Sequence, residues 1–171
     1  MKTFVITLSS VFPTTHPRKG KGTAFAPAFR NGQTCRKCKE NNPALCLGDC
    51  FSVRKIHTIR ANYPLWAKRI AQIQNGEAVL SIRQWTGKPY RSKQVEIARL
   101  SSEDGVGIQE LRLTDLSRPT TINGTQVELP ALAQNDGLSF DDWFHWFKGY
   151  DLSKPLGIIH FTKFRYGNGK D

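Results

Sequence analysis

The chain has 171 residues, of which 39% are hydrophobic and 11% aromatic, so it can bury a core and is not expected to be disordered. Its 25 Lys and Arg residues outnumber 14 Asp and Glu residues, giving a formal net charge of +11. No apolar run is long enough to span a membrane, and Phe4 to Leu8 is too short for a signal-peptide core. We therefore expect a cytoplasmic protein without membrane attachment, with a single domain over residues 1–171.

The positive charge is concentrated in the first part of the chain. Residues 1–100 contain 18 Lys or Arg against four Asp or Glu, whereas residues 101–171 contain seven against ten. Such an uneven field is typical of a domain that binds phosphate backbones, because neutralised phosphates release condensed counterions. A solubilising surface without a partner is the alternative interpretation.

The first predicted element is a buried strand over the apolar run from Lys2 to Leu8. Residues 9–22 contain two prolines, two glycines and the basic cluster Arg18-Lys19-Gly20-Lys21, which indicates a loop. His16 lies within it and is expected at the surface. Residues 23–29 are expected to form a short strand or a turn.

All the cysteines lie between residues 35 and 50, as a Cys-x-x-Cys pair and a Cys-x-x-x-Cys pair separated by seven residues. Each pair can chelate a metal from a tight turn, and four thiolates suit tetrahedral zinc. Two disulfides or four free thiols are the alternatives, and disulfides would need an oxidising compartment. We predict an inserted zinc knuckle over residues 35–50, structural because no coordination position is open, with ligands Cys35, Cys38, Cys46 and Cys50.

The segment from residue 54 to residue 63 carries the densest chemistry, because Lys55, His57, Thr58 and Arg60 lie within six residues. In a regular strand, Lys55 and His57 would point to one face while Thr58 and Arg60 would point to the other. All four could face one ligand only if the strand bends or bulges, so we expect a strand end that opens into a loop. A solvated edge strand whose charges discourage aggregation is the alternative.

Residues 54–60, Arg-Lys-Ile-His-Thr-Ile-Arg, resemble the Lys-x-x-Thr-x-Arg signature of ASCH domains. These domains are a branch of the PUA-like β-barrels, which are associated with RNA and modified nucleosides. The resemblance extends to small bacterial amidohydrolases that remove acetyl from N4-acetylcytidine with a Lys, a Thr and a later Glu. It implies that Lys55 and Thr58 are catalytic. The acidic partner that it implies is Asp136, whose side chain is one methylene shorter and places the carboxylate differently.

Residues 62–76 are predicted to form a helix that Asn62 caps and Gly76 ends, with an apolar stripe at Tyr63, Trp66, Ile70 and Ile73. The alternating residues from Ala78 to Trp85 predict a strand. The following turn, residues 87–93, interleaves cations with an aromatic ring, as in contacts to single-stranded nucleic acid. An ordinary charged hairpin loop is the alternative. The candidate residues are Trp85, Lys88, Tyr90, Arg91 and Lys93.

The rest of the chain predicts further short strands over residues 94–100, 108–113 and 156–164, and a turn at Asn123-Gly124. Residues 140–147 predict a second helix, with Ser139 as its cap and His145 exposed to solvent. This pattern indicates an α+β fold. Together with the resemblance, it predicts a small, mostly antiparallel PUA-like β-barrel with two or more flanking helices and the zinc knuckle.

Two functions follow from these residues. In the first, the protein binds RNA or a modified nucleoside: Arg60, with Lys55 and His57 beside it, meets a phosphate or a base edge, and the turn at residues 88–93 stacks bases. In the second, it is an amidohydrolase in which Thr58 is the nucleophile, Lys55 is the base and Asp136 relays the proton. The charge distribution favours binding. A protein-interaction module that uses the zinc knuckle and the acidic later segment is a third class, which the composition merely permits.

Overall fold

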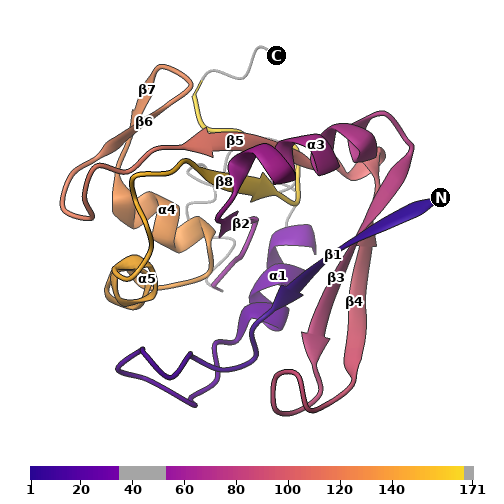
Figure 1. The fold of residues 1–171 in the computed structure, drawn as a ribbon, viewed down its shortest axis with the longest axis horizontal. Coiled ribbons are helices and arrows are strands. Elements are labelled where there is room, and N and C mark those ends of the chain that lie inside the picture. Colours follow the sequence, from indigo (N-terminus) through magenta and orange to yellow (C-terminus); the bar gives the residue numbers. More distant parts are fainter. Residues whose placement is uncertain (35–52, 168–171) are drawn as a thin grey trace.

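The computed structural model describes residues 1–34 and 53–167. The four cysteines fall outside these ranges, so the zinc knuckle stays a prediction. The described residues form an α+β fold (Figure 1). Its strands are β1 (Lys2–Leu8), β2 (His57–Arg60), β3 (Ala78–Trp85), β4 (Gln94–Leu100), β5 (Gly107–Leu111), β6 (Thr120–Ile122), β7 (Thr125–Val127) and β8 (Leu156–His160). Its α-helices are α1 (Phe25–Thr34), α3 (Tyr63–Gln74), α4 (Leu129–Asn135) and α5 (Phe140–Phe147), and a 3-10 turn covers Ser102–Asp104.

The described strands form three sheets, with strand orders β1-β3-β4, β2-β8-β5 and β6-β7. Among the described strands, only the β1–β3 pairing is parallel, which confirms the mostly antiparallel prediction. The predicted closed barrel is not found among these strands, because β1 and β2 each remain the edge of a separate sheet. The backbone just before β2 pairs elsewhere: the Lys55 N–H donates to the Ala28 carbonyl (2.9 Å) and the Ile56 N–H to the Asn135 carbonyl (2.9 Å).

Most predicted helices and strands are confirmed, and the residues predicted to cap the helices and form the turn do so. The Asn62 side chain accepts from the Leu65 N–H at the start of α3 (3.3 Å). The Ser139 hydroxyl accepts from the Asp142 N–H at the start of α5 (3.1 Å). Asn123 and Gly124 both have positive φ, 51° and 77°, which gives β6 and β7 a tight two-residue hairpin. The predicted last strand is shorter than expected, because β8 ends at His160.

Two predictions about the early chain were wrong. Residues 25–34 form helix α1 in place of a short strand or turn, because apolar residues recur at helical spacing and Pro27 lies in the first turn, where a missing N–H costs nothing. His16 is buried, not exposed. It stacks on Phe12 with ring centroids 4.4 Å apart, and its Nε2 lies 3.1 Å from the Asp142 carbonyl oxygen.

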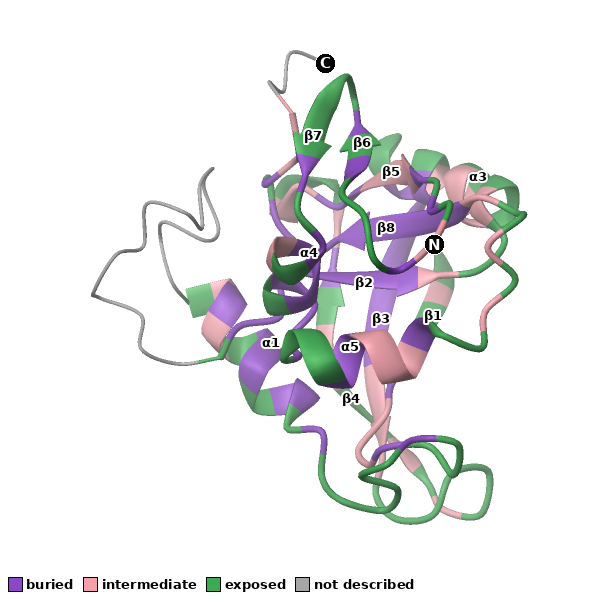
Figure 2. Ribbon diagram, turned by 90° about the vertical axis from the view of Figure 1, so that its left-hand side faces the viewer, coloured by how far each residue is buried: buried purple, intermediate pink, exposed green. Residues whose placement is uncertain are grey.

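The buried apolar side chains form one cluster that runs through the described part of the chain. In Figure 1, the β1-β3-β4 sheet lies on one side, α4 and α5 lie on the opposite side, and β2, β8 and α1 lie between them. Figure 2 shows β8 buried along its whole length and β2 buried over most of it. Lys55, His57 and Thr58 are therefore enclosed at 2%, 0% and 5% exposure, which excludes the solvated edge strand.

Helix α1 lies against residues 55 and 56 through a close backbone approach. A Cβ atom on Gly32 would lie 2.9 Å from the Lys55 carbonyl oxygen and 2.9 Å from the Ile56 side chain. Real Cβ atoms are not found this close to a backbone atom, so the helix can lie against residues 55 and 56 only where it carries a glycine.

We expect Gly32→Ala to lower the free energy of unfolding by about 1–3 kcal/mol, because the added methyl group overpacks this contact. In an unconstrained helix the same change would stabilise by about 0.5–1 kcal/mol, so the sign is informative. Urea denaturation measures it, and Gly149→Ala is the matched control because a Cβ there meets open space. A Gly32→Ala protein as stable as the wild type would contradict the close approach.

Candidate functional site

The site is centred on a buried ion pair between Lys55 and Asp136. The Lys55 Nζ lies 2.5 Å from Asp136 Oδ1 and also donates to the Asp136 backbone carbonyl at 2.7 Å. Its remaining face lies over the Phe25 ring, 4.2 Å from the centroid. The two residues are only 2% and 3% exposed. The ammonium is thus held by one carboxylate, one carbonyl and one aromatic ring, away from bulk solvent.

The sequence around Asp136 explains its placement. Asp136 is the C-cap of α4, and the next residue, Gly137, has a φ of 82°. The Leu138 N–H then donates to the Ala133 carbonyl (3.0 Å), which is the Schellman closure of a helix end. A Cβ on Gly137 would lie 3.1 Å from Lys55 Cβ, so a glycine here also lets Lys55 approach. A cation at a helix C-terminus is favoured by the helix dipole, and Lys55 provides it.

Burial changes the proton affinity of both partners. Burial lowers the pKa of the Lys55 amine, and the negative charge of Asp136 opposes this only in part. Burial raises the pKa of the Asp136 carboxyl, against the opposing effect of Lys55 and Arg60. The two pKa values are thus displaced toward each other, so the pair can exchange the proton between Nζ and Oδ1 more readily than an exposed Lys–Asp pair could.

A small cavity of about 60 Å³ opens beside the ion pair, and we call it the Lys55 cavity. Because one buried water needs about 10–15 Å³, it has room for roughly four waters or a short acyl group, but not for a nucleobase. Its apolar lining includes Phe25, Leu138 and Trp146. Its polar lining includes Thr7, Ser9, Lys55, Thr58, Arg60, Asp136 and Tyr150.

Of the four candidate residues between positions 55 and 60, all except His57 therefore line one cavity. Thr58 and Arg60 lie on one face of β2, and Lys55 joins them because the chain leaves the regular strand at Ile56. This confirms the expected strand end opening into a loop. One Arg60 N–H donates to the Thr7 carbonyl (2.8 Å), while its buried Nε has no hydrogen-bond partner in residues 1–34 and 53–167. Burial lowers the pKa of the Arg60 guanidinium, and Tyr150 and Asp136 oppose this.

His57 faces away from this cavity, into a second buried polar cluster. Its Nε2 lies 2.8 Å from the Tyr166 hydroxyl, which also accepts from the Asn135 amide (2.8 Å). We assign the hydroxyl proton to the His57 Nε2 contact, which leaves the ring proton on Nδ1. Nδ1 lies 4.0 Å from Asp136 Oδ1 and has no hydrogen-bond partner within the described residues. The His160 ring lies 5.7 Å from the His57 ring, and neither of its nitrogens has a partner within the described chain. Burial holds the pKa of both imidazoles well below 6.5.

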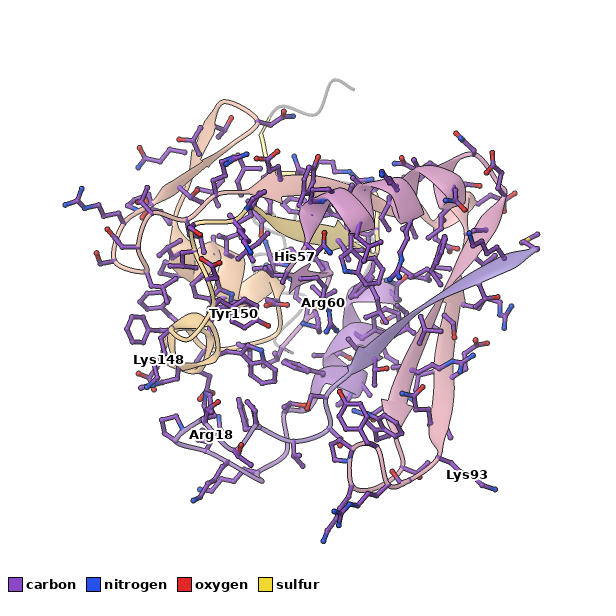
Figure 3. All side chains as sticks on the ribbon, viewed as in Figure 1. Arg18, His57, Arg60, Lys93, Lys148 and Tyr150 are labelled. Atoms are coloured by element: carbon purple, nitrogen blue, oxygen red, sulfur yellow. The ribbon has the colours of Figure 1, made fainter. Side chains whose placement is uncertain are left out.

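The remaining predicted residues lie elsewhere. Trp85 ends β3, and Lys88, Tyr90, Arg91 and Lys93 follow in the exposed turn between β3 and β4. Figure 3 shows Lys93 at an outer corner of the molecule, well apart from Arg60 and Tyr150. The predicted zinc ligands lie in residues 35–52, and the described residues contain no group of His, Cys, Asp or Glu arranged to hold a metal ion.

Sequence reasoning missed two tyrosines and a larger pocket. Tyr150 lines the Lys55 cavity, and its place three residues after Phe147 continues the apolar stripe of α5. Tyr166, which was assigned to no predicted element, is buried against His57. A pocket of about 490 Å³ shares Leu138 with the Lys55 cavity, and its lining also includes Arg18, Thr23, Gln134 and Ser139. We call it the Arg18 pocket.

Comparisons with protein-family models, with curated proteins and with solved structures found no match for the chain. None of the helices in the described residues is long and apolar enough to cross a membrane.

The buried histidines make stability depend on pH. Below pH 6.5 the unfolded chain binds a proton on His57 and on His160 that the folded protein excludes. The free energy of unfolding should therefore fall as pH decreases, by up to about 1.4 kcal/mol per pH unit for each histidine. Urea titrations between about pH 5 and 7 measure this slope.

His160→Phe should reduce the slope by about half, because one of the two excluded protons is removed. Asp136, whose raised pKa acts in the opposite sense at lower pH, is present in both proteins and cancels in the comparison. Equal slopes in the wild type and the variant would contradict neutral, buried imidazoles.

Proposed function

We propose that the protein binds a modified nucleoside, free or within RNA, and hydrolyses its exocyclic amide, as an N4-acetylcytidine-type amidohydrolase would. The observation that carries this proposal is the convergence of a hydroxyl, an amine, a guanidinium and a carboxyl on one small cavity. The contributing residues are Thr58, Lys55, Arg60 and Asp136. The likeness of residues 54–60 to the ASCH signature supports the same assignment and a PUA-like relationship of the fold.

In this proposal the ion pair generates the base. When the shared proton rests on Asp136, Lys55 is a neutral amine that can take the hydroxyl proton of Thr58. The Thr58 oxygen then forms a bond to the amide carbon, and the Arg60 N–H groups stabilise the negative charge on the carbonyl oxygen. Lys55 returns the proton to the leaving nitrogen as the carbon–nitrogen bond breaks. Water then hydrolyses the acylated Thr58 and releases the carboxylic acid.

The volumes of the cavity and the pocket support placing different parts of the substrate in each. The Lys55 cavity has about 60 Å³, which suits the short acyl group alone. The Arg18 pocket has about 490 Å³, within the usual range for ligand pockets, and Leu138 is common to both. We therefore place the acyl group in the cavity and the base and ribose toward the pocket.

Binding without hydrolysis is the second candidate, and the exposed turn between β3 and β4 favours it. Tyr90 is 90% exposed there, and Lys88, Arg91 and Lys93 are exposed beside it. In this case Lys55 and Arg60 would hold a phosphate or base edge, and the Thr58 hydroxyl would need no activation.

The Thr58 hydroxyl separates the two candidates. Thr58→Val keeps the shape of the side chain and removes the nucleophile, so turnover of N4-acetylcytidine should fall by at least about a thousandfold. Thr58→Ser retains a hydroxyl and should keep measurable activity. Release of cytidine, followed by liquid chromatography, measures both variants.

A Thr58→Val protein that is folded and within tenfold of wild-type turnover would refute the nucleophile. Absence of turnover in the wild type, with retained binding of the nucleoside, would favour the second candidate. Thermal unfolding of each variant checks that the buried substitution has not disrupted the fold.

A further inference from the structure

Two segments carry exposed basic side chains that the proposed hydrolysis does not use. The first is the basic loop, residues 9–24, with Lys19 and Lys21, and the second is the hairpin turn, residues 86–93, with Lys88, Arg91 and Lys93. Residues 1–34 and 78–95 contain no Asp or Glu at all. None of these five cations forms an ion pair with a described acidic residue. Their charges are therefore available to an external anion.

Hydrogen bonds tie the backbone of the exposed hairpin turn together. The Thr86 N–H and hydroxyl both donate to the Lys93 carbonyl (2.9 and 3.0 Å), and the Ser92 hydroxyl donates to the Lys88 carbonyl (2.9 Å). Tyr90 has a φ of 62°, a conformation that a bulky residue rarely adopts, and its ring stands in solvent 5.3 Å from the Trp85 ring. An exposed aromatic ring between cations is suited to stacking on a base.

The basic loop is also held in place. The Phe12 N–H donates to the Lys21 carbonyl (2.9 Å), and the Gly20 N–H donates to the Phe12 carbonyl (3.1 Å). Arg18 lies over the Phe12 ring at 4.7 Å and pairs with Asp142 at 2.5 Å, so it anchors the loop to α5. Lys19 and Lys21 are thus presented from an ordered loop that forms part of the Arg18 pocket.

The basic loop begins at the wall of the Lys55 cavity, and the hairpin turn is connected to that wall through β1. Thr7, Leu8 and Ser9 line that cavity, and Ser9 is the first residue of the basic loop. Leu8 pairs with Gln84 just before the hairpin, and the Gln94 amide just after it donates to the Thr7 hydroxyl (3.1 Å). Figures 1 and 2 show the two segments at the same end of the molecule. In Figure 3, Arg18 and Lys93 mark two corners of this end, with Arg60 deeper between them.

We propose that the basic loop and the hairpin turn together bind the backbone and bases of a single-stranded nucleic acid that flanks the nucleotide at the Lys55 cavity. This rests on the proposed function and specifies its substrate as a nucleotide within a strand, not a free nucleoside. The lysines meet phosphates, and Tyr90 with Trp85 stacks a neighbouring base. A neutral nucleoside would use neither set of cations.

The test compares matched charge removals in the full-length protein. Lys19→Ala/Lys21→Ala and Lys88→Ala/Lys93→Ala each remove two charges from the proposed surface, and Lys68→Ala/Lys154→Ala removes two exposed charges elsewhere. The probe is an unmodified single-stranded oligoribonucleotide, and fluorescence anisotropy over a range of salt concentrations gives its Kd. We expect each of the first two variants to bind about tenfold more weakly and to lower the salt slope by about two.

Tyr90→Ala should weaken binding by about tenfold without changing the salt slope, because stacking releases no counterions. The two lysine double variants should also lower kcat/KM for an oligoribonucleotide that contains one N4-acetylcytidine. This decrease should be about tenfold larger than the decrease that the same variants cause with free N4-acetylcytidine. The Lys68→Ala/Lys154→Ala control should stay within about twofold of the wild type in every assay.

The inference is overturned if the loop variants bind the probe as the control does, if Kd does not depend on salt, or if a duplex binds as tightly as the single strand. Each of these results leaves the Thr58 experiment standing. Conversely, suppose that the protein has no hydrolytic activity while both lysine double variants lose probe binding. That result would support nucleic-acid binding by the basic loop and the hairpin turn and would refute the proposed hydrolysis.

Discussion

The buried pair of Lys55 and Asp136 is the constraint on which the rest of this structure depends. The two residues are 81 positions apart, and each is almost completely shielded from water. A buried charge without a partner would cost several kcal/mol, so α1, the start of β2 and the end of α4 must come together in the folded protein. The glycines at positions 32 and 137 leave the space for that approach.

This pair also gives the site its chemistry. Desolvation lowers the pKa of the amine and raises that of the carboxyl, a combination that favours proton transfer beside a hydroxyl and a guanidinium. The enclosed space is small, so only the reacting group of a ligand can reach it. The larger pocket, the basic loop and the hairpin turn lie outside it, and there we propose that the body of a nucleotide and its neighbours bind. In the proposed function, the reaction and the recognition of the substrate would thus take place in separate parts of the molecule.

Local sequence signals predicted much of the secondary structure, and the elements and contacts that they did not predict have physical causes. Helices α3 and α5 and strands β3 and β4 were predicted because periodicity, caps and turns agree there. Helix α1 was missed because Pro27 and Gly32 look like helix breakers, although one lies in the first turn and the other makes a close contact. The position of Lys55 beside Thr58 depends on long-range pairing with Asn135 and Asp136, which strand periodicity cannot report. Tyr166 was missed for the same reason.

A double-mutant cycle on the pair tests this account most directly, using Lys55→Met, Asp136→Leu and the combined variant in urea denaturation. Each single change should lower the free energy of unfolding by about 3–5 kcal/mol, because it leaves one buried charge without its partner. The combined variant should lose much less than the sum and recover toward wild-type stability, because neither charge remains. Single changes that cost little, or costs that simply add, would show that the two groups do not depend on each other and would contradict the account.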